Sequence, residues 1–135
     1  MANREFDVIV WGATGFTGQL VVEYLVQTYG VSGDLRWAIA GRNQSKLESV
    51  RQSCLSAAEC DQLPILIADS NDTASLASLV RQTRVMCTTV GPYAKFGTPL
   101  VSACVDAGTH YCDLTGEVQW MARVIPEYQQ AAEAS

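Results

Sequence analysis

The 135-residue sequence lacks the features that define several large classes of protein. It has one histidine and five cysteines without a C-x-x-C pair, so no zinc-ligand spacing is present. No apolar run approaches the roughly 20 residues of a membrane-spanning helix. The first residues also lack the charged-then-apolar form of a signal peptide. The net charge is −5, with no basic cluster, which argues against nucleic acid as a partner. We therefore expect a cytoplasmic protein without a metal site or a transmembrane segment.

The five cysteines are interpreted as reduced structural thiols, because their odd number and irregular spacing do not suggest a disulfide framework. Cys87 and Cys112 fall within expected strands, so we expect both to be small buried hydrophobic residues. Cys54 and Cys60 flank the end of a helix, where they could be more exposed. Cys104 completes the set.

The composition, 48% hydrophobic and 17% charged, is typical of a globular domain with one core. Strand-like and helix-like segments alternate, which predicts an α/β fold: a doubly wound parallel sheet of the Rossmann type, strand order 3-2-1-4-5, with helices on both faces. We expect residues 1–135 to form one such domain. Strands are expected at 6–11, 35–40, 64–68, 85–90 and 110–113. Helices are expected at 16–29 and 44–57, after Asp72 as a cap, at about 98–107, and over 118–135, where Pro126 kinks the helix or starts a new one.

Three glycines with the spacing G-x-x-G-x-x-G lie between the first strand and the first helix. Gly12 and Gly15 would provide a tight turn and let a phosphate approach the backbone, because neither has a Cβ atom. Gly18 would let the helix pack closely against the strand. The amides of Gly15, Phe16 and Thr17 would point at a pyrophosphate, with the positive end of the helix dipole behind them. The pattern predicts a dinucleotide-binding turn.

Residues in the loops after the second and third strands indicate which dinucleotide is bound. The second strand ends in Ala-Gly-Arg42-Asn, without the acidic residue that usually binds the ribose hydroxyls of NAD, and Lys46 follows one helical turn later. Arg42 would pair with a 2′-phosphate, although it could instead be a solvated surface residue. The pattern favours NADP over NAD. Asp69 could accept from the adenine amino group or act as a helix-capping turn residue.

The loop after the fourth strand, Val90-Gly91-Pro92, is expected to run beneath the cofactor, although it could be only a structural turn. The nearby Tyr93 and Lys95 have the spacing Tyr-x-Lys on a loop rather than Tyr-x-x-x-Lys on a helix. Their side chains would diverge, so we do not assign them as a catalytic pair.

Two acids follow the fifth strand. Asp113 and Glu117 could bind substrate or transfer protons, but turn and cap roles are favoured. His110 lies at the amino end of that strand, on the wrong side for catalysis. The catalytic residues therefore remain unassigned.

Four segments, at 12–18, 40–42, 89–93 and 110–117, resemble in the same order the motifs of the saccharopine dehydrogenase-like oxidoreductases, which include bacterial trans-acting enoyl reductases. The resemblance implies a nicotinamide cofactor and hydride transfer, and it spans essentially the whole chain. Together with the arguments above, it gives these expected cofactor-binding residues: Gly12, Ala13, Thr14, Gly15, Phe16, Thr17, Arg42, Asp69, Val90, Gly91 and Pro92.

Members of that family look much longer, so we expect this chain to be the amino-terminal cofactor domain, with the small-molecule substrate bound by an absent domain that also dimerises. The fragment alone would then be inactive. An enoyl or lipid-like substrate is at least as plausible as saccharopine, and an open edge at the fifth strand would favour a homodimer. Two other functions stay open: a non-catalytic nucleotide-binding sensor or scaffold, and an atypical short-chain reductase.

Overall fold

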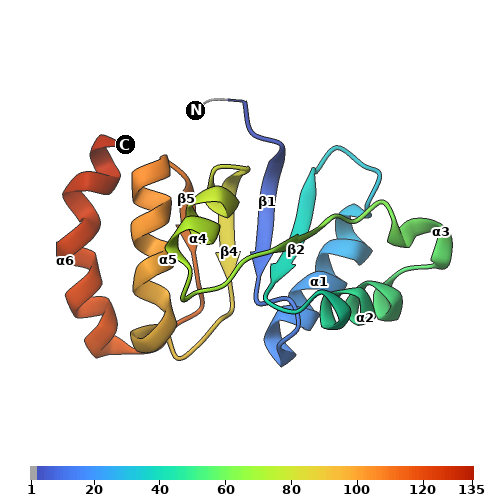
Figure 1. Ribbon diagram of the computed structural model, residues 1–135, viewed down its shortest axis with the longest axis horizontal. Coiled ribbons are helices and arrows are strands. Elements are labelled where there is room, and N and C mark those ends of the chain that lie inside the picture. The colour runs from blue at the N-terminus through green and yellow to red at the C-terminus, as the bar shows by residue number, and fades with distance from the viewer. Residues whose placement is uncertain (1–2) are drawn as a thin grey trace.

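Five parallel strands form the centre of the computed structural model, which describes residues 3–135 (Figure 1). Their order is β3-β2-β1-β4-β5, which confirms the predicted doubly wound sheet. The carboxyl ends of all five strands therefore meet at one edge of the sheet. The strands are β1 (Phe6–Trp11), β2 (Trp37–Gly41), β3 (Ile65–Ile67), β4 (Thr83–Thr88) and β5 (His110–Cys112).

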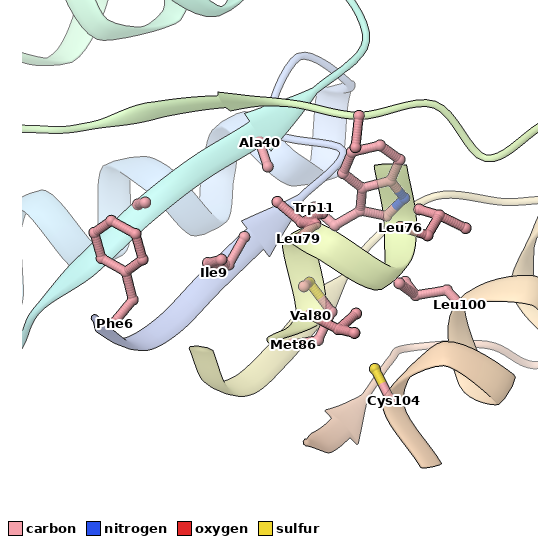
Figure 2. Packing of buried hydrophobic residues seen from close by; sticks show 12 residues of the cluster. Phe6, Ile9, Trp11, Ala40, Leu76, Leu79, Val80, Met86, Leu100 and Cys104 are labelled. Carbon is pink, nitrogen blue, oxygen red and sulfur yellow. The ribbon is translucent and has the colours of Figure 1, made fainter. Parts of the chain in front are cut away.

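Helices cover both faces of the sheet (Figure 1). The helices are α1 (Phe16–Tyr29), α2 (Gln44–Cys54), α3 (Ala57–Cys60), α4 (Thr73–Val80), α5 (Tyr93–Ala107) and α6 (Val118–Ala134). Val10 of β1 packs with residues of α1 and α2, whereas its neighbours Ile9 and Trp11 pack with residues of α4 and α5 (Figure 2). Alternate residues of a strand point to opposite faces, so β1 is buried from both sides. No helix within residues 3–135 is long and apolar enough to cross a membrane.

The predicted helix at 44–57 is in fact two helices. Leu55 adopts an extended conformation after α2, and its side chain is buried in the cluster that includes Leu47 and Val50. A new helix, α3, starts at once because Ser56 is its N-cap, and the Ser56 hydroxyl bonds the Glu59 carboxylate at 2.7 Å. The S-x-x-E signature of a helix start was present in the sequence and was missed.

One further expectation about the elements was wrong: the segment from Tyr93 to Phe96 is the first turn of α5 rather than a loop. For Pro126, one of the two alternatives is excluded, because α6 runs through this residue and no new helix starts there. Proline cannot donate to the carbonyl of Ala122, but both residues are exposed, so water can satisfy that carbonyl. β3 is a short strand at the edge of the sheet, and Ile67 is half exposed.

The cysteines also depart from expectation. Cys112 is exposed and Cys87 is half-buried, so neither is the buried hydrophobic residue that was predicted. Cys112 lies on the edge strand β5, which has a neighbour on one side only, and Cys87 lies on the adjacent strand β4. Cys104 is buried, and burial raises the pKa of its thiol to about 12. Within residues 3–135 all five thiols are free, and no cluster of three potential metal ligands occurs.

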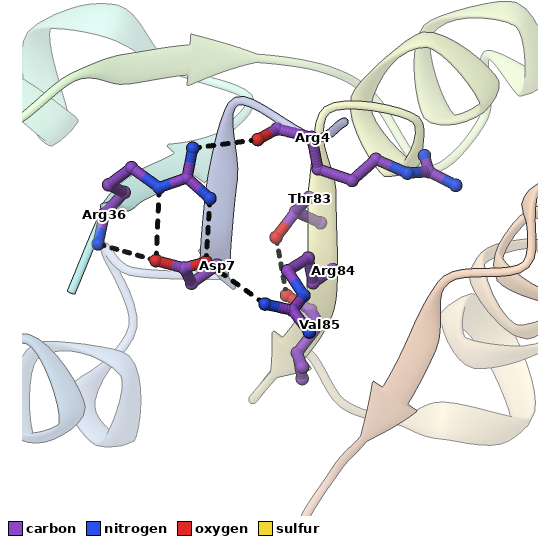
Figure 3. A network of polar contacts seen from close by, with 6 residues as sticks. All are labelled: Arg4, Asp7, Arg36, Thr83, Arg84 and Val85. Carbon is purple, nitrogen blue, oxygen red and sulfur yellow. Dashed lines mark hydrogen bonds and ion pairs between the residues drawn. The ribbon is translucent and has the colours of Figure 1, made fainter. Parts of the chain in front are cut away.

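An ion pair joins β1 to the segment before β2 at the amino end of the sheet (Figure 3). Arg36 Nη2 lies 2.9 Å from Asp7 Oδ1, and Arg36 Nε donates to Asp7 Oδ2 at 3.3 Å. Arg84 of β4 lies farther away, at 3.9 Å. The bonds from Arg36 hold the pKa of the Asp7 carboxyl below its usual range. This network lies at the opposite end of the strands from the loops that were predicted to bind a cofactor.

Acid is expected to remove the contribution of Asp7 to stability. The pKa of Asp7 is lower in the folded state, so the carboxylate stabilises the fold above its unfolded-state pKa and loses this effect as the pH falls through the folded-state pKa. Urea unfolding at pH 7 and pH 3 should therefore show a smaller acid-induced loss of stability in Asp7→Asn than in the wild type. An identical pH dependence in the two proteins would contradict the assignment.

Gly97 of α5 provides the space for Trp120 of α6. A Cβ atom at position 97 would lie 2.7 Å from Cζ2 of the Trp120 ring. The Trp120 indole is 4% exposed and donates to the Thr98 hydroxyl at 3.0 Å, so it has little room to move. This contact fixes α6 against α5.

Gly97→Ala is expected to destabilise the protein by about 1–3 kcal/mol through overpacking, although alanine favours helices over glycine by roughly 1 kcal/mol. Denaturant unfolding monitored by tryptophan fluorescence would measure the change. Gly116→Ala is the matched control, since a Cβ atom there would meet nothing within 4 Å. A stabilised Gly97→Ala protein would show that α6 does not pack here as described.

Candidate functional site

A crevice of about 340 Å³ opens at the carboxyl ends of β1, β2 and β4. The chain reverses its direction of winding at this point, which is where open α/β sheets bind ligands. Seven of the eleven expected cofactor-binding residues line the crevice: Gly12, Thr14, Gly15, Arg42, Asp69, Val90 and Gly91. The other four, Ala13, Phe16, Thr17 and Pro92, do not line it, and the Phe16 side chain is 83% exposed. Phe96, which also lines it, was not predicted.

Two glycines of the turn are required by the packing of the protein itself. Gly12 has a φ of 86°, and a Cβ atom there would lie 2.5 Å from a methyl carbon of Val90. A Cβ atom on Gly18 would overlap the carbonyl oxygen of Gly12. The prediction that Gly18 brings the helix close to the strand agrees with this geometry.

Gly15 differs from the other two glycines. It is the N-cap of α1 with a φ of −74°, which any residue can adopt, and a Cβ atom would be 3.6 Å from its nearest neighbour, the Gly12 oxygen. No contact within residues 3–135 therefore demands glycine here. Gly15 itself lines the crevice.

The amides of the turn only partly follow the prediction. The Gly15 amide donates to the Gly12 carbonyl at 3.2 Å, so it closes the turn and is not free for a ligand. Phe16 and Thr17 are the first residues of α1, and their amides have no acceptor within the helix. Gln19 braces the turn through a 2.9 Å bond from its side chain to the Thr14 carbonyl. The amides of Phe16 and Thr17 are therefore the free hydrogen-bond donors at this helix start, and they lie at the positive end of the helix dipole.

Arg42 stands at one end of the crevice, directly after β2. It is exposed, and the ion pairs found within residues 3–135 are made by Arg36 and Arg84, so its charge is not neutralised. Asn43 caps α2 by accepting from the Lys46 amide at 3.1 Å. Lys46 borders a smaller neighbouring hollow that shares Thr14 with the crevice. Two cations thus flank the same threonine.

Asp69 was interpreted as either a turn residue or a contact to the adenine, and the structure shows the turn role. Its carboxylate accepts from the Asn71 amide at 2.9 Å, and its carbonyl accepts from the Asp72 amide at 2.9 Å. Asp72 in turn caps α4, as predicted. Asp69 also lines the crevice, so contact with an adenine ring stays a prediction beside this role.

The loop after β4 forms the opposite wall of the crevice. The Thr89 amide donates to the Trp11 carbonyl at 3.2 Å, which ties the loop to β1. The Val90 amide donates to the Thr88 hydroxyl at 3.2 Å, and the Gly91–Pro92 peptide is cis. These contacts hold Val90 against Gly12.

Tyr93 is buried and does not face a ligand. Its hydroxyl donates to the Thr88 carbonyl at 3.3 Å, and its ring lies 5.5 Å from that of Trp120. Burial raises the pKa of Tyr93. Lys95 instead lies over the Phe96 ring, 5.2 Å from its centroid. The two residues do not form a tyrosine–lysine catalytic pair.

Asp113 and Glu117 form the link between β5 and α5. Glu117 accepts from the amides of Tyr93 and Ala94, at 2.6 and 3.0 Å, and so caps α5 from 24 residues downstream. Asp113 accepts from the Tyr111 hydroxyl at 2.7 Å and from the Thr115 amide at 3.0 Å. Burial, and the bond to Asp113, raise the pKa of Tyr111. Cap and turn roles, the favoured interpretation, account for both acids, and His110 lies at the amino end of β5.

A larger groove, of about 1000 Å³, lies beside β5 and between α5 and α6. Its lining is mainly apolar and includes Tyr111, Met121, Val124 and Tyr128. None of the residues that were expected to bind the cofactor lines this groove. The smaller crevice, where the glycine turn and Arg42 converge, is therefore the better candidate for the functional site.

The sequence and fold were compared with known proteins. The family model for the saccharopine dehydrogenase NADP binding domain matches residues 8–135. A candidate trans-acting enoyl reductase of Mycobacterium tuberculosis is 43% identical over 129 residues, which are 96% of this chain and 30% of that protein. A trans-acting enoyl reductase of Mycobacterium bovis is 39% identical over 131 residues, 97% of this chain and 30% of that protein. The chain thus spans less than a third of the length of these relatives.

The fold is similar to that of solved reductases. A Citrobacter triphenylmethane reductase, solved with NADP(H), superposes with a TM-score of 0.68 over 95% of this chain and 45% of its own. The identity is 21%, so the likeness concerns the fold alone. It agrees with the strand order and the helix layers described above.

Proposed function

Because the chain belongs to the saccharopine dehydrogenase family of NADP-binding domains, we propose that its crevice holds NADP(H) for a reductase that acts on an enoyl substrate. NADP is the cofactor of this family, as Arg42 had suggested from the sequence. The proposal concerns which residues hold the cofactor and which reaction it serves.

The observation that carries the assignment is Gly15. The packing of the protein explains the glycines at 12 and 18 but not the one at 15, which lines the crevice and where a Cβ atom would meet protein atoms only at ordinary contact distance. A pyrophosphate beside a bare backbone needs that space. We therefore place the pyrophosphate over Gly15, within reach of the Phe16 and Thr17 amides.

The 2′-phosphate is assigned to the end of the crevice at Arg42. Its guanidinium is exposed and unpaired, and such a group binds phosphate through charge-assisted hydrogen bonds. Lys46, across Thr14, would add a second positive charge. Asp69, at the same end, is placed beside the adenine.

The nicotinamide half of the cofactor would extend to the other end of the crevice, along Val90, Gly91 and Phe96. When bound, NADPH supplies the hydride for reduction of a carbon–carbon double bond. The bonds from Thr89 to β1 and from Val90 to Thr88 keep this wall fixed, so it would orient the ring. Tyr93 and Glu117 support the start of α5 after this wall, Asp113 holds the turn after β5, and none of the three has a catalytic role in the proposal.

An enoyl substrate is proposed from the names of the relatives, which are reductases of that kind. The proposal leaves substrate binding and proton donation to residues outside this crevice, and includes assembly as a homodimer in the cytoplasm. Enoyl thioesters should drive NADPH oxidation by a protein of the relatives' length that contains this chain. NADPH binding without turnover of any enoyl, carbonyl or imine compound would instead support the non-catalytic sensor.

Arg42→Ala tests the cofactor assignment. Loss of a charge-assisted contact worth about 1.5–3 kcal/mol should raise the Kd for NADPH roughly 10- to 100-fold and leave the Kd for NADH nearly unchanged. Fluorescence titration of the purified chain would measure both. Arg123→Ala, an exposed arginine on α6, is the control for a general loss of positive charge. Equal losses for the two nucleotides would refute the role of Arg42.

A further inference from the structure

Two cysteines lie side by side on the edge strand β5 and its neighbour β4. Cys87 of β4 and Cys112 of β5 are direct partners in the parallel register. Paired residues of neighbouring parallel strands point to the same face, so the two thiols share one side of the sheet. Cys87 also pairs with Val10, which faces α1 and α2, so the thiols lie on that face and not beneath α5.

Their spacing is compatible with a disulfide. Neighbouring strands lie about 4.8 Å apart, within the roughly 4.4–6.8 Å between Cα atoms that disulfides span. A bridge between the two would therefore need no large movement of the backbone. Cys112 is exposed, and exposed bridges are more easily reduced than buried structural ones.

The two thiols are also accessible and unequal. Cys112 is exposed and Cys87 is half-buried. A hydrogen bond from the Cys87 thiol lowers the pKa of Cys112 to about 7, against the opposing effects of burial and the charge of Asp113. The same bond and burial raise the pKa of Cys87. Cys112 is therefore the attacking sulfur of the pair, because the thiolate is the nucleophile.

We propose that Cys87 and Cys112 form a dithiol site that is oxidised reversibly by small-molecule disulfides such as glutathione disulfide. The Cys112 thiolate attacks one sulfur of the disulfide, forms a mixed disulfide and releases one thiolate. Cys87, after losing its proton, attacks the Cys112 sulfur and releases the second thiolate. The two protein thiols are oxidised, the small disulfide is reduced to two thiols, and the two protons from the cysteines remain with these products.

The site is separate from the cofactor crevice, which neither cysteine lines. It joins β4 to β5, and β4 leads directly to the Val90 wall of the crevice. The proposal does not depend on the proposed enzymatic function, because it needs only the folded chain.

Equilibration of the folded 135-residue chain in buffers with graded ratios of oxidised to reduced glutathione tests the proposal. After acid quenching and alkylation of the remaining thiols, peptide mass spectrometry should show a Cys87–Cys112 link at a lower ratio than any other cysteine modification. Reduced glutathione in excess should reverse it. Circular dichroism in the same buffers would show that the chain stays folded.

Variants separate a built site from general thiol reactivity. Cys87→Ser should leave a persistent glutathione adduct on Cys112, because the resolving thiol is absent, whereas Cys54→Ser should leave the link unchanged. A wild-type chain in which Cys112 keeps the adduct while Cys87 stays free would overturn the proposal. So would a Cys54–Cys60 link that forms at the same ratio, or no reaction of the folded chain in excess oxidised glutathione.

Discussion

Gly15→Ala is expected to raise the Kd for NADPH by about 10- to 100-fold while the protein remains folded, through the loss of phosphate contacts worth about 1.5–3 kcal/mol. The backbone at Gly15 accepts any residue, and the added methyl group would meet protein atoms only at ordinary contact distance. Gly15 lines the crevice beside the start of α1, so we expect the methyl group to hinder the approach of the pyrophosphate. Titration with NADPH and denaturant unfolding of the same protein would measure the two effects.

The test depends on a contrast between two measurements on the Gly15→Ala protein, its affinity for NADPH and its free energy of unfolding. Alanine is a weaker N-cap than glycine by less than about 1 kcal/mol, so the free energy of unfolding should change little. Adenosine 2′,5′-bisphosphate, which lacks the pyrophosphate bridge, should lose less affinity than NADPH. Unchanged NADPH binding by a folded Gly15→Ala protein would show that the pyrophosphate does not lie over this turn.

Gly18→Ala should have the opposite effect, a large loss of stability. A Cβ atom at position 18 would overlap the carbonyl oxygen of Gly12, which is backbone and cannot rotate away. α1 would have to move off β1, and we expect a cost of about 3 kcal/mol or more, beyond the usual range for overpacking. Urea unfolding, or failure to obtain folded protein, would report the change.

Two comparisons allow the Gly18→Ala result to be interpreted. In an ordinary helix the same substitution would stabilise by roughly 1 kcal/mol, so even a neutral result would contradict the close packing. Gly116→Ala, at a glycine with open space around it, controls for the general effect of adding a methyl group. If the Gly18→Ala protein folds with reduced stability, saturating NADPH should recover part of the loss, because ligand binding favours the folded state.

The order of the elements could be read from the sequence because local signals agree with the fold. The period of the apolar residues marked β1 and α1, and the glycine spacing marked the turn between them. Alternation of strands and helices implies right-handed crossovers, which leave few possible strand orders. Arg42 could be singled out because the residue after β2 has a fixed place relative to Gly12 in that topology.

The errors lie where distant residues decide local structure. No residue between Tyr93 and Phe96 indicates a helix start in the sequence, because the cap is Glu117. Its carboxylate reaches the amides of Tyr93 and Ala94 only after β5 is in place. The Gly15 amide is another example, since it is occupied by the Gly12 carbonyl once the turn closes. The exposure of Cys112 follows from the position of β5 at the edge of the sheet.

The sequence by itself determined the fold class, the glycine turn between β1 and α1 and the preference for NADP, because each depends on residue types at short, fixed spacings. Only the tertiary structure decided what each residue does there. It separated Gly15, which leaves room for a ligand, from Gly12 and Gly18, which leave room for the protein. It also gave Glu117 the role of capping α5 and Asp113 that of holding the turn after β5, and brought Cys87 beside Cys112. The reason is physical: the contacts of Glu117 with α5 and of Cys87 with Cys112 join residues more than 20 positions apart in the sequence, and no local spacing shows which of them meet.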